Sequence, residues 1–354
     1  MDIQQLLKLT IENKASDLHL LVGISPAVRI DGVLSSLSNF PALTEQAIEQ
    51  MIFSLISPDQ KERLVANKEL DFSFGFGGPT GNGGRFRTNA YYQRGYLSAA
   101  FRYLEPKIKT VEDLMLPKIC DEFTKLKQGF ILVTGPTGQG KSTTLAAIIN
   151  QINQTRAEHI LTIEDPIEYI YPNGKSIISQ REMGLDSHSW SHALRSALRE
   201  DPDVVLIGEM RDPETIAEAV TIAETGHLVF STLHTNSASQ TIDRIIDSFP
   251  AAQQAQIRIQ LASTLKGIIS QRLLPQISGG RVPAVEVLIG NSAIASNIRD
   301  GKTHLIDSII ETSQGVGMMS LEQSLSALVM AGTISLETAK SYALRPDDLL
   351  RLTT

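Results

Sequence analysis

The stretch of the chain most suited to chemistry is the loop Gly135-Pro136-Thr137-Gly138-Gln139-Gly140-Lys141-Ser142, followed by Thr143. It satisfies the Walker A pattern G-x-x-x-x-G-K-[ST] at every fixed position. Such a loop wraps backbone N–H groups around phosphate oxygens, and the helix that follows adds the partial positive charge of its N-terminus. Lys141 would reach the β- and γ-phosphates, and the Ser142 hydroxyl would coordinate Mg²⁺. We therefore expect residues 135–143 to bind ATP with Mg²⁺.

Two acidic residues follow apolar runs farther along the chain, Glu164 after Ile163 and Glu209 after Gly208. Ligands of parallel α/β sheets bind beyond the carboxyl ends of the strands, so both acids are candidates to face the γ-phosphate. Glu209 follows its strand as a Walker B acid does, and we expect it to hold Mg²⁺ together with Ser142, directly or through water. Either carboxylate could also polarise the attacking water. Helix capping or solvation is the alternative interpretation of such acids.

Phosphoryl transfer builds negative charge on the equatorial oxygens, so a cationic sensor or an arginine finger is expected near the site. His234 follows an apolar run at the expected carboxyl edge. Four arginines in the first hundred residues or just beyond are further candidates: Arg85, Arg87, Arg94 and Arg102. Taken alone, an arginine of this kind is more often a surface residue.

The elements that must position these groups are indicated by short apolar runs alternating with helical patterns. The runs are 130–133, 160–163, 204–207 and 228–230. Uninterrupted apolar runs of this length are typical of buried parallel strands. From Gly129 onward the sequence therefore predicts a doubly wound α/β domain.

The rest of the chain divides by the spacing of its apolar residues and by its glycine and proline content. Helical spacing over 2–14 and strand-like alternation thereafter predict a small α/β domain at the N-terminus. The glycine-rich stretch 75–84 has no helical pattern after it, so we expect a hairpin connection there and no second phosphate loop. Helical patterns without clear strands follow residue 290. The predicted parts are the N-terminal domain 1–104, a proline-containing linker 105–117, the ATPase core 118–290 and a helical C-terminal tail 291–354.

Composition excludes several classes of protein. The 354 residues carry 32 basic and 39 acidic side chains, a net charge of −7 that argues against a protein that coats nucleic acid. The single cysteine, Cys120, allows neither an intramolecular disulfide nor a cysteine zinc cage. No apolar run reaches the ~18 residues of a membrane helix, and the N-terminus lacks the pattern of a secretory signal. We therefore expect a cytoplasmic protein.

Seven segments together resemble the type II/IV secretion and pilus ATPases, and most closely the PilT-like retraction ATPases of type IV pili. They are 15–20, 85–89, 135–142, 161–168, 195–203, 208–212 and 225–235. The resemblance implies a PAS-like N-terminal domain, a RecA-like P-loop ATPase domain and a ring of six subunits. It implies an ATP-hydrolysing motor for pilus retraction and twitching motility, docked from the cytoplasm on an inner-membrane platform protein. Neither zinc nor nucleic acid is expected as a partner.

The resemblance also implies roles for single residues. Glu164 matches the catalytic glutamate of the acidic box, Glu209 the Walker B glutamate, and His234 the histidine near the γ-phosphate. Arg87 and Arg102 match the first-domain arginines that close onto the nucleotide, whereas the roles of Arg85 and Arg94 stay open.

One departure leaves the direction of movement open, because Ala295 stands where retraction ATPases usually carry an arginine. A nucleotide-binding accessory retraction subunit and another secretion-type ATPase are therefore alternatives. A RecA-like nucleic-acid translocase is disfavoured by the acidic net charge.

Overall fold

The computed structural model describes residues 2–30, 32–77 and 83–353, and it divides into two compact units. The first comprises the residues up to Lys107 together with Pro166–Ile170, and the second comprises Ile108–Asp165 and Tyr171–Thr354. The inclusion of Pro166–Ile170 in the first unit was not indicated by the sequence. The finer division into domains, linker and tail stays a prediction. Part of the predicted hairpin connection at 75–84 lies outside the described residues.

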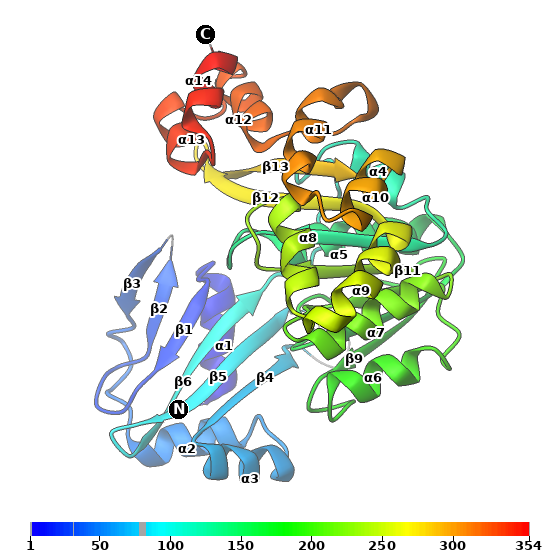
Figure 1. The fold of residues 1–354 in the computed structure, drawn as a ribbon. Helices are drawn as coiled ribbons and strands as arrows, with labels where there is room; N and C mark the ends of the chain where they lie inside the picture. The colour runs from blue at the N-terminus through cyan, green and yellow to red at the C-terminus, as the bar shows by residue number, and fades with distance from the viewer. Residues whose placement is uncertain (1, 31, 78–82, 354) are drawn as a thin grey trace. The chain divides into compact units, whose positions relative to one another are not determined.

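The first unit is built on a six-stranded antiparallel sheet of order β3-β2-β1-β6-β5-β4 (Figure 1). Its core combines the apolar face of α1, including Leu6 and Leu7, with strand residues such as Leu18 and Phe101. The Asp2 side chain begins α1 by accepting a hydrogen bond from the backbone of Gln4, as N-caps do. Its elements are α1 (Ile3–Glu12), β1 (Asp17–Leu20), β2 (Ala27–Ile30), β3 (Val33–Ser36), α2 (Glu45–Phe53), α3 (Pro58–Asn67), β4 (Glu69–Gly75), β5 (Arg85–Gln93) and β6 (Tyr96–Leu104).

The second unit is an α/β domain around a seven-stranded sheet of order β13-β12-β7-β11-β10-β8-β9. Its first elements are α4 (Ile119–Phe123), β7 (Gly129–Thr134), α5 (Lys141–Thr155), β8 (His159–Glu164), β9 (Ile177–Glu182), α6 (Trp190–Ala197), β10 (Val204–Ile207), α7 (Pro213–Glu224), β11 (Leu228–Leu233), α8 (Ala238–Asp247), α9 (Ala251–Thr264), β12 (Leu265–Pro275) and β13 (Arg281–Ile289). Neighbouring strands are parallel except β13, which pairs antiparallel with β12 at the edge.

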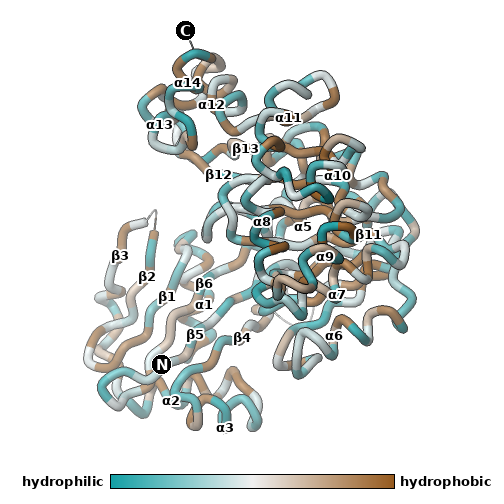
Figure 2. Tube along the Cα trace, viewed as in Figure 1, coloured by the Kyte–Doolittle hydropathy of each residue, from teal (hydrophilic) through white to brown (hydrophobic). Residues whose placement is uncertain are grey.

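The four apolar runs predicted as parallel strands are β7, β8, β10 and β11, the centre of this sheet. Every residue of β7, β10 and β11 is buried, because helices cover both faces of the sheet. Figure 2 shows hydrophobic residues along the strands near the β11 and β13 labels. The sequence did not indicate β9, β12 or β13. Cys120 lies in this core, and burial raises the pKa of its thiol to about 12.

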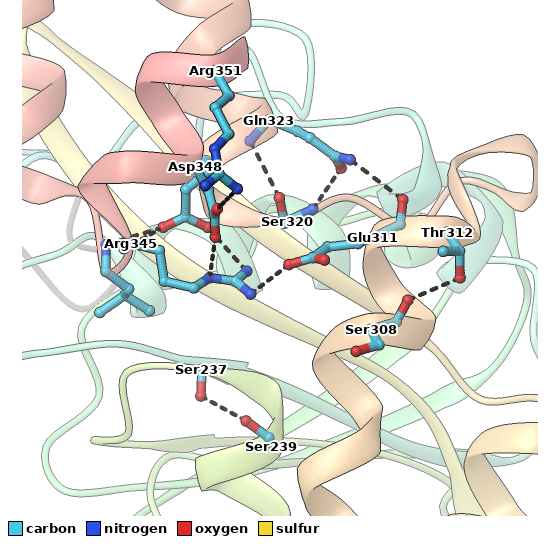
Figure 3. Close-up of polar contacts among 12 residues, drawn as sticks. Ser237, Ser239, Ser308, Glu311, Thr312, Ser320, Gln323, Arg345, Asp348 and Arg351 are labelled. Carbon is cyan, nitrogen blue, oxygen red and sulfur yellow. Dashed lines mark hydrogen bonds and ion pairs between the residues drawn. The ribbon is translucent and has the colours of Figure 1, made fainter.

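Residues after β13 are helical, as predicted. They form α10 (Ser292–Arg299), α11 (Ile306–Thr312), α12 (Leu321–Met330), α13 (Leu336–Tyr342) and α14 (Pro346–Thr353), with short 3₁₀ turns at Thr303–Leu305 and Gln314–Val316. The last three helices share a small core with the far ends of β12 and β13. Figure 3 shows Arg345 between the carboxylates of Glu311 and Asp348, and Arg345 also pairs with the buried Glu322. These ion pairs join α11, α12 and α14.

Candidate nucleotide site

The phosphate-loop sequence lies between β7 and α5, as the pattern predicts. Gly135 directly follows the strand with φ +141°, and Gly140 precedes the helix with φ +82°. A Cβ at Gly135 would also lie closer than 3.0 Å to the backbone oxygen of Gln271 on β12. Only glycine fits this position, because the backbone conformation and the close approach of β12 both exclude a side chain.

The Lys141 ammonium is held inside this loop. Lys141 is only 8% exposed, and its Nζ donates hydrogen bonds to the carbonyl oxygens of Gly135 at 2.8 Å and Pro136 at 3.0 Å. Thr137, Gly138 and Ser142 are exposed, so the loop and the first turn of α5 present backbone and hydroxyl groups to solvent around a buried cation. Backbone N–H groups, a helix N-terminus and a lysine together make a phosphate-binding arrangement.

His234 connects this lysine to Glu209. The Lys141 Nζ lies 3.5 Å from His234 Nδ1, and His234 Nε2 lies 3.4 Å from Glu209 Oε2. Because an ammonium can only donate, Nδ1 must accept, which places the imidazole proton on Nε2, where it faces the carboxylate. The other Glu209 oxygen pairs with the exposed Arg211. The imidazole of His234, the carboxylate of Glu209 and the guanidinium of Arg211 are thus linked in series next to Lys141 of the phosphate loop.

The order of strands explains this juxtaposition. β7, β11, β10 and β8 are consecutive neighbours in the parallel sheet. At or just beyond their carboxyl ends stand, in the same order, the phosphate loop, His234, Glu209 and Glu164. The loop before Glu209 is fixed to β11, because the Thr232 hydroxyl donates to the carbonyl of Gly208 at 2.7 Å. Parallel strands therefore align the four predicted groups along one sheet edge.

Glu164 lies at that edge but is held by β8 and β9. Its Oε1 accepts hydrogen bonds from the Thr162 hydroxyl at 2.7 Å and from Gln180 Nε2 at 3.3 Å. Its backbone packs against Gly208, where an added Cβ would approach the Glu164 Cα at 3.3 Å. Glu164 and Glu209 are therefore neighbours through the paired strands β8 and β10.

Two of the arginines predicted in the N-terminal unit, Arg87 and Arg102, lie on adjacent strands of its sheet. Arg102 on β6 donates from Nε to Asp17 Oδ1 at 3.0 Å, and its side chain is 67% exposed. Arg87 on β5 pairs with Arg102 in register and lies 3.6 Å from Glu168, in the segment that belongs to this unit.

The other two arginines are placed differently. Arg85 donates to the Ile167 carbonyl at 3.2 Å and contacts Ser73. Arg94 occupies the turn between β5 and β6 with φ +51°. Arg85 thus fixes a chain segment, and Arg94 forms a turn.

Three residues at this edge of the second unit were missed by sequence reasoning: Gln271, Arg272 and Glu286. All are buried on β12 or β13 and hydrogen-bond the loops of the site. The available signal was the polar group Ser270-Gln271-Arg272 inside an otherwise apolar run. Within the described residues, no three His, Cys, Asp or Glu side chains gather as a metal-binding group, and no helix is long and apolar enough to cross a membrane.

The fold and the groups at this sheet edge define a P-loop α/β protein. Comparisons with known proteins identify the family to which it belongs. The sequence profile of the type II/IV secretion system protein family matches residues 76–319. The chain belongs to this family.

Full-length relatives are found among curated proteins. The chain is 45% identical over 348 residues to the type IV pilus retraction ATPase PilT of Pseudomonas aeruginosa, covering 98% of this chain and 100% of that protein. It is 38% identical over 350 residues to the type IV pilus ATPase PilU of the same species, covering 99% of this chain and 90% of that protein.

Solved structures agree with this fold. A crystal structure of the pilus retraction motor PilT with bound ADP has a TM-score of 0.91 at 49% identity and covers 99% of both chains. The ATPase DotB of Legionella pneumophila has a TM-score of 0.83 at 26% identity, covering 96% of this chain and 94% of that chain. The predicted fold class, an N-terminal α/β domain followed by a P-loop ATPase domain with a helical C-terminal region, is confirmed.

Proposed function

We propose that the chain is a magnesium-dependent ATPase that powers the retraction of type IV pili as a homohexamer. The observation that carries the proposal is the alignment of the phosphate loop, His234, Glu209 and Glu164 along one edge of the parallel sheet. The full-length similarity to PilT, a retraction ATPase, supports pilus retraction as the work done. We further propose that the motor works in the cytoplasm, docked on an inner-membrane platform protein of the pilus machine.

The phosphate loop is proposed to hold the β- and γ-phosphates through the backbone of residues 135–140, the first turn of α5 and Lys141. The lysine has two carbonyl hydrogen bonds in the loop, and it would exchange them for phosphate oxygens, which are stronger acceptors. Ser142 and Thr143 stand at the N-terminus of α5, where the helix dipole favours negative charge.

The oxygen donors at the site fit a magnesium ion. The Ser142 residue is exposed and the Glu209 carboxylate keeps 18% of its side chain accessible, and both supply the hard oxygen ligands that Mg²⁺ prefers. When bound, the ion would neutralise charge on the phosphate oxygens. Glu209, next to His234, would orient the attacking water, and Glu164 is the second carboxylate available for this task. His234 carries the Nε2 proton toward Glu209 and keeps that carboxylate oriented.

Arg87 and Arg102 are proposed to act on nucleotide held by a neighbouring copy of the chain in the ring. Both guanidinium groups are substantially exposed on their sheet, at 40% and 67% of the side chain, so each can reach an external anion. A cation supplied by a neighbour would stabilise the charge that develops on the transferred phosphoryl group.

A second candidate function is a nucleotide-binding accessory retraction subunit. It is favoured by Ala295, which stands where retraction ATPases usually carry an arginine. The two differ in whether the purified chain turns over ATP without a partner.

Phosphate release from ATP and Mg²⁺ tests the proposal. The purified chain should hydrolyse ATP alone, and Lys141→Ala should remove the activity, with Lys266→Ala as a control outside the loop. Unchanged turnover in Lys141→Ala would refute the assignment of the loop. Nucleotide binding without turnover in the wild-type chain would favour the accessory role.

A further inference from the structure

The carboxyl-terminal part of β12 carries two adjacent polar side chains that are almost fully buried. Gln271 is 3% exposed and Arg272 is 7% exposed, and they stand on the strand between Ser270, which is also buried, and Leu273. Buried polar groups are costly unless they are hydrogen-bonded, so their partners show what they stabilise. Neighbouring strand residues point to opposite faces of a sheet, so the two side chains reach different parts of the site.

Gln271 joins β12 to the phosphate loop and to α5. Its Nε2 donates to the carbonyl of Gln139 at 2.6 Å, and its Oε1 accepts from the Thr144 hydroxyl at 2.8 Å. The Gln139 side chain returns a second link, since its Oε1 accepts from the backbone N–H of Leu273 at 2.6 Å. One amide thus holds the end of the loop and the first turn of the helix, on either side of Lys141.

Arg272 holds the loop between β11 and α8, which contains His234 and Asn236. Its Nη2 donates to Asn236 Oδ1 at 2.9 Å and to the Asn236 carbonyl at 3.3 Å, two residues after His234. Glu286, which lies on β13, accepts from the backbone N–H of Ala238 at 2.6 Å, at the start of α8. The β12–β13 hairpin therefore holds the chain segment that follows His234 at two points.

We propose that Gln271 and Arg272 are positioning residues of the nucleotide site, with Gln271 setting the phosphate loop and Arg272 setting the loop that carries His234. The inference rests on the proposed function of that site. Neither side chain reaches the phosphates in this assignment. Gln271 acts through Gln139 and Thr144 on the loop that binds, whereas Arg272 acts through Asn236 on the histidine that faces Glu209.

The two roles predict different kinetic effects. Gln271→Leu loses one hydrogen bond to the loop and one to the first turn of α5, and should weaken nucleotide binding about tenfold to thirtyfold. Arg272→Lys keeps the charge but loses the planar guanidinium, whose Nη2 donates to both Asn236 oxygens while its Nη1 donates to the Gln271 carbonyl. It should lower kcat about tenfold with KM little changed, because the phosphate loop is intact. A general loss of packing would lower the fraction of active protein for both variants in the same way.

The test measures binding of a fluorescent ADP analogue and steady-state ATP turnover in the full-length chain. Gln276→Leu and Arg281→Lys are matched controls, since both positions lie on the same hairpin beyond the site, and neither should change affinity or turnover. Thr144→Val removes the other partner of Gln271 and should weaken binding in the same direction. It keeps the inference testable if Gln271→Leu does not fold.

Three results would overturn the inference. A wild-type chain that neither binds nor hydrolyses nucleotide removes the proposed function and the inference together. A wild-type chain that does both, with Gln271→Leu and Thr144→Val binding as tightly as the control, refutes the role of Gln271 alone. Equal changes of KM and kcat in Arg272→Lys refute the separate role of Arg272.

Discussion

Replacement of Gly135 by alanine tests how closely the phosphate loop packs against β12. The residue has φ +141°, a conformation that alanine adopts at a cost of about 1–3 kcal/mol. The added Cβ would also lie closer than 3.0 Å to the Gln271 carbonyl oxygen, which belongs to backbone inside the sheet and cannot rotate away. Overpacking of this kind costs about 1–3 kcal/mol more. We therefore expect Gly135→Ala to lower the free energy of unfolding by about 4 kcal/mol and to abolish nucleotide binding.

Gly138→Ala is the matched control in the same loop. Gly138 has φ +79°, and an added Cβ would meet nothing within 4 Å. Only the backbone cost of about 1 kcal/mol remains. The assay is urea unfolding followed by the fluorescence of Trp190, the single tryptophan, which lies in the second unit, together with binding of a fluorescent ADP analogue. If Gly135→Ala is as stable as Gly138→Ala and binds nucleotide as wild type does, the packing argument is wrong.

Two further predictions concern an exposed arginine and a buried acid. Arg102→Ala should lower ATP turnover at least tenfold while changing the free energy of unfolding by less than about 1 kcal/mol, because an ion pair with a mostly exposed arginine contributes little. Normal turnover in this variant would remove Arg102 from the residues that act on the nucleotide. Lys8→Ala, at another exposed ion pair, is the control. Burial raises the pKa of Glu286 from 4.5 to about 7, so the unfolded chain ionises this group first as pH rises. The contribution of Glu286 to the free energy of unfolding is therefore fully present below pH 4.5 and is lost as the pH rises to about 7. Relative to Glu286→Gln, the free energy of unfolding of the wild-type chain should fall by about 3 kcal/mol over this range. An equal pH dependence in both proteins would contradict this. The groups that face Glu286 are Arg272, Asp307, Glu322, Arg345 and the backbone N–H of Ala238.

The central sheet could be predicted from the sequence because its strands are buried on both faces. Strands of this kind have uninterrupted apolar sequences. The apolar runs that end near Val133, Ile163, Ile207 and Phe230 are each a strand in the structure. The hairpin β12–β13 could not be predicted in this way, since buried polar residues interrupt its apolar pattern. Those interruptions are the residues that bond the loops of the site.

The sequence predicted that Lys141, His234 and Glu209 lie at the same edge of the sheet, but not that they contact one another. Each follows or adjoins a predicted strand, and parallel strands bring their carboxyl ends together. The order β7-β11-β10-β8 depends on crossovers between distant segments, which local patterns do not encode. For the same reason, the sequence did not show that Gln180 on β9 holds Glu164.

Pilus retraction is tested most directly by counting surface pili on cells that lack the gene and on cells complemented with wild type or Lys141→Ala. If the chain drives retraction, cells that lack the gene should be hyperpiliated and should not twitch. Wild type should restore normal pilus numbers and twitching, and Lys141→Ala should not. Loss of pili on deletion, or full rescue by Lys141→Ala, would contradict an ATP-driven retraction motor.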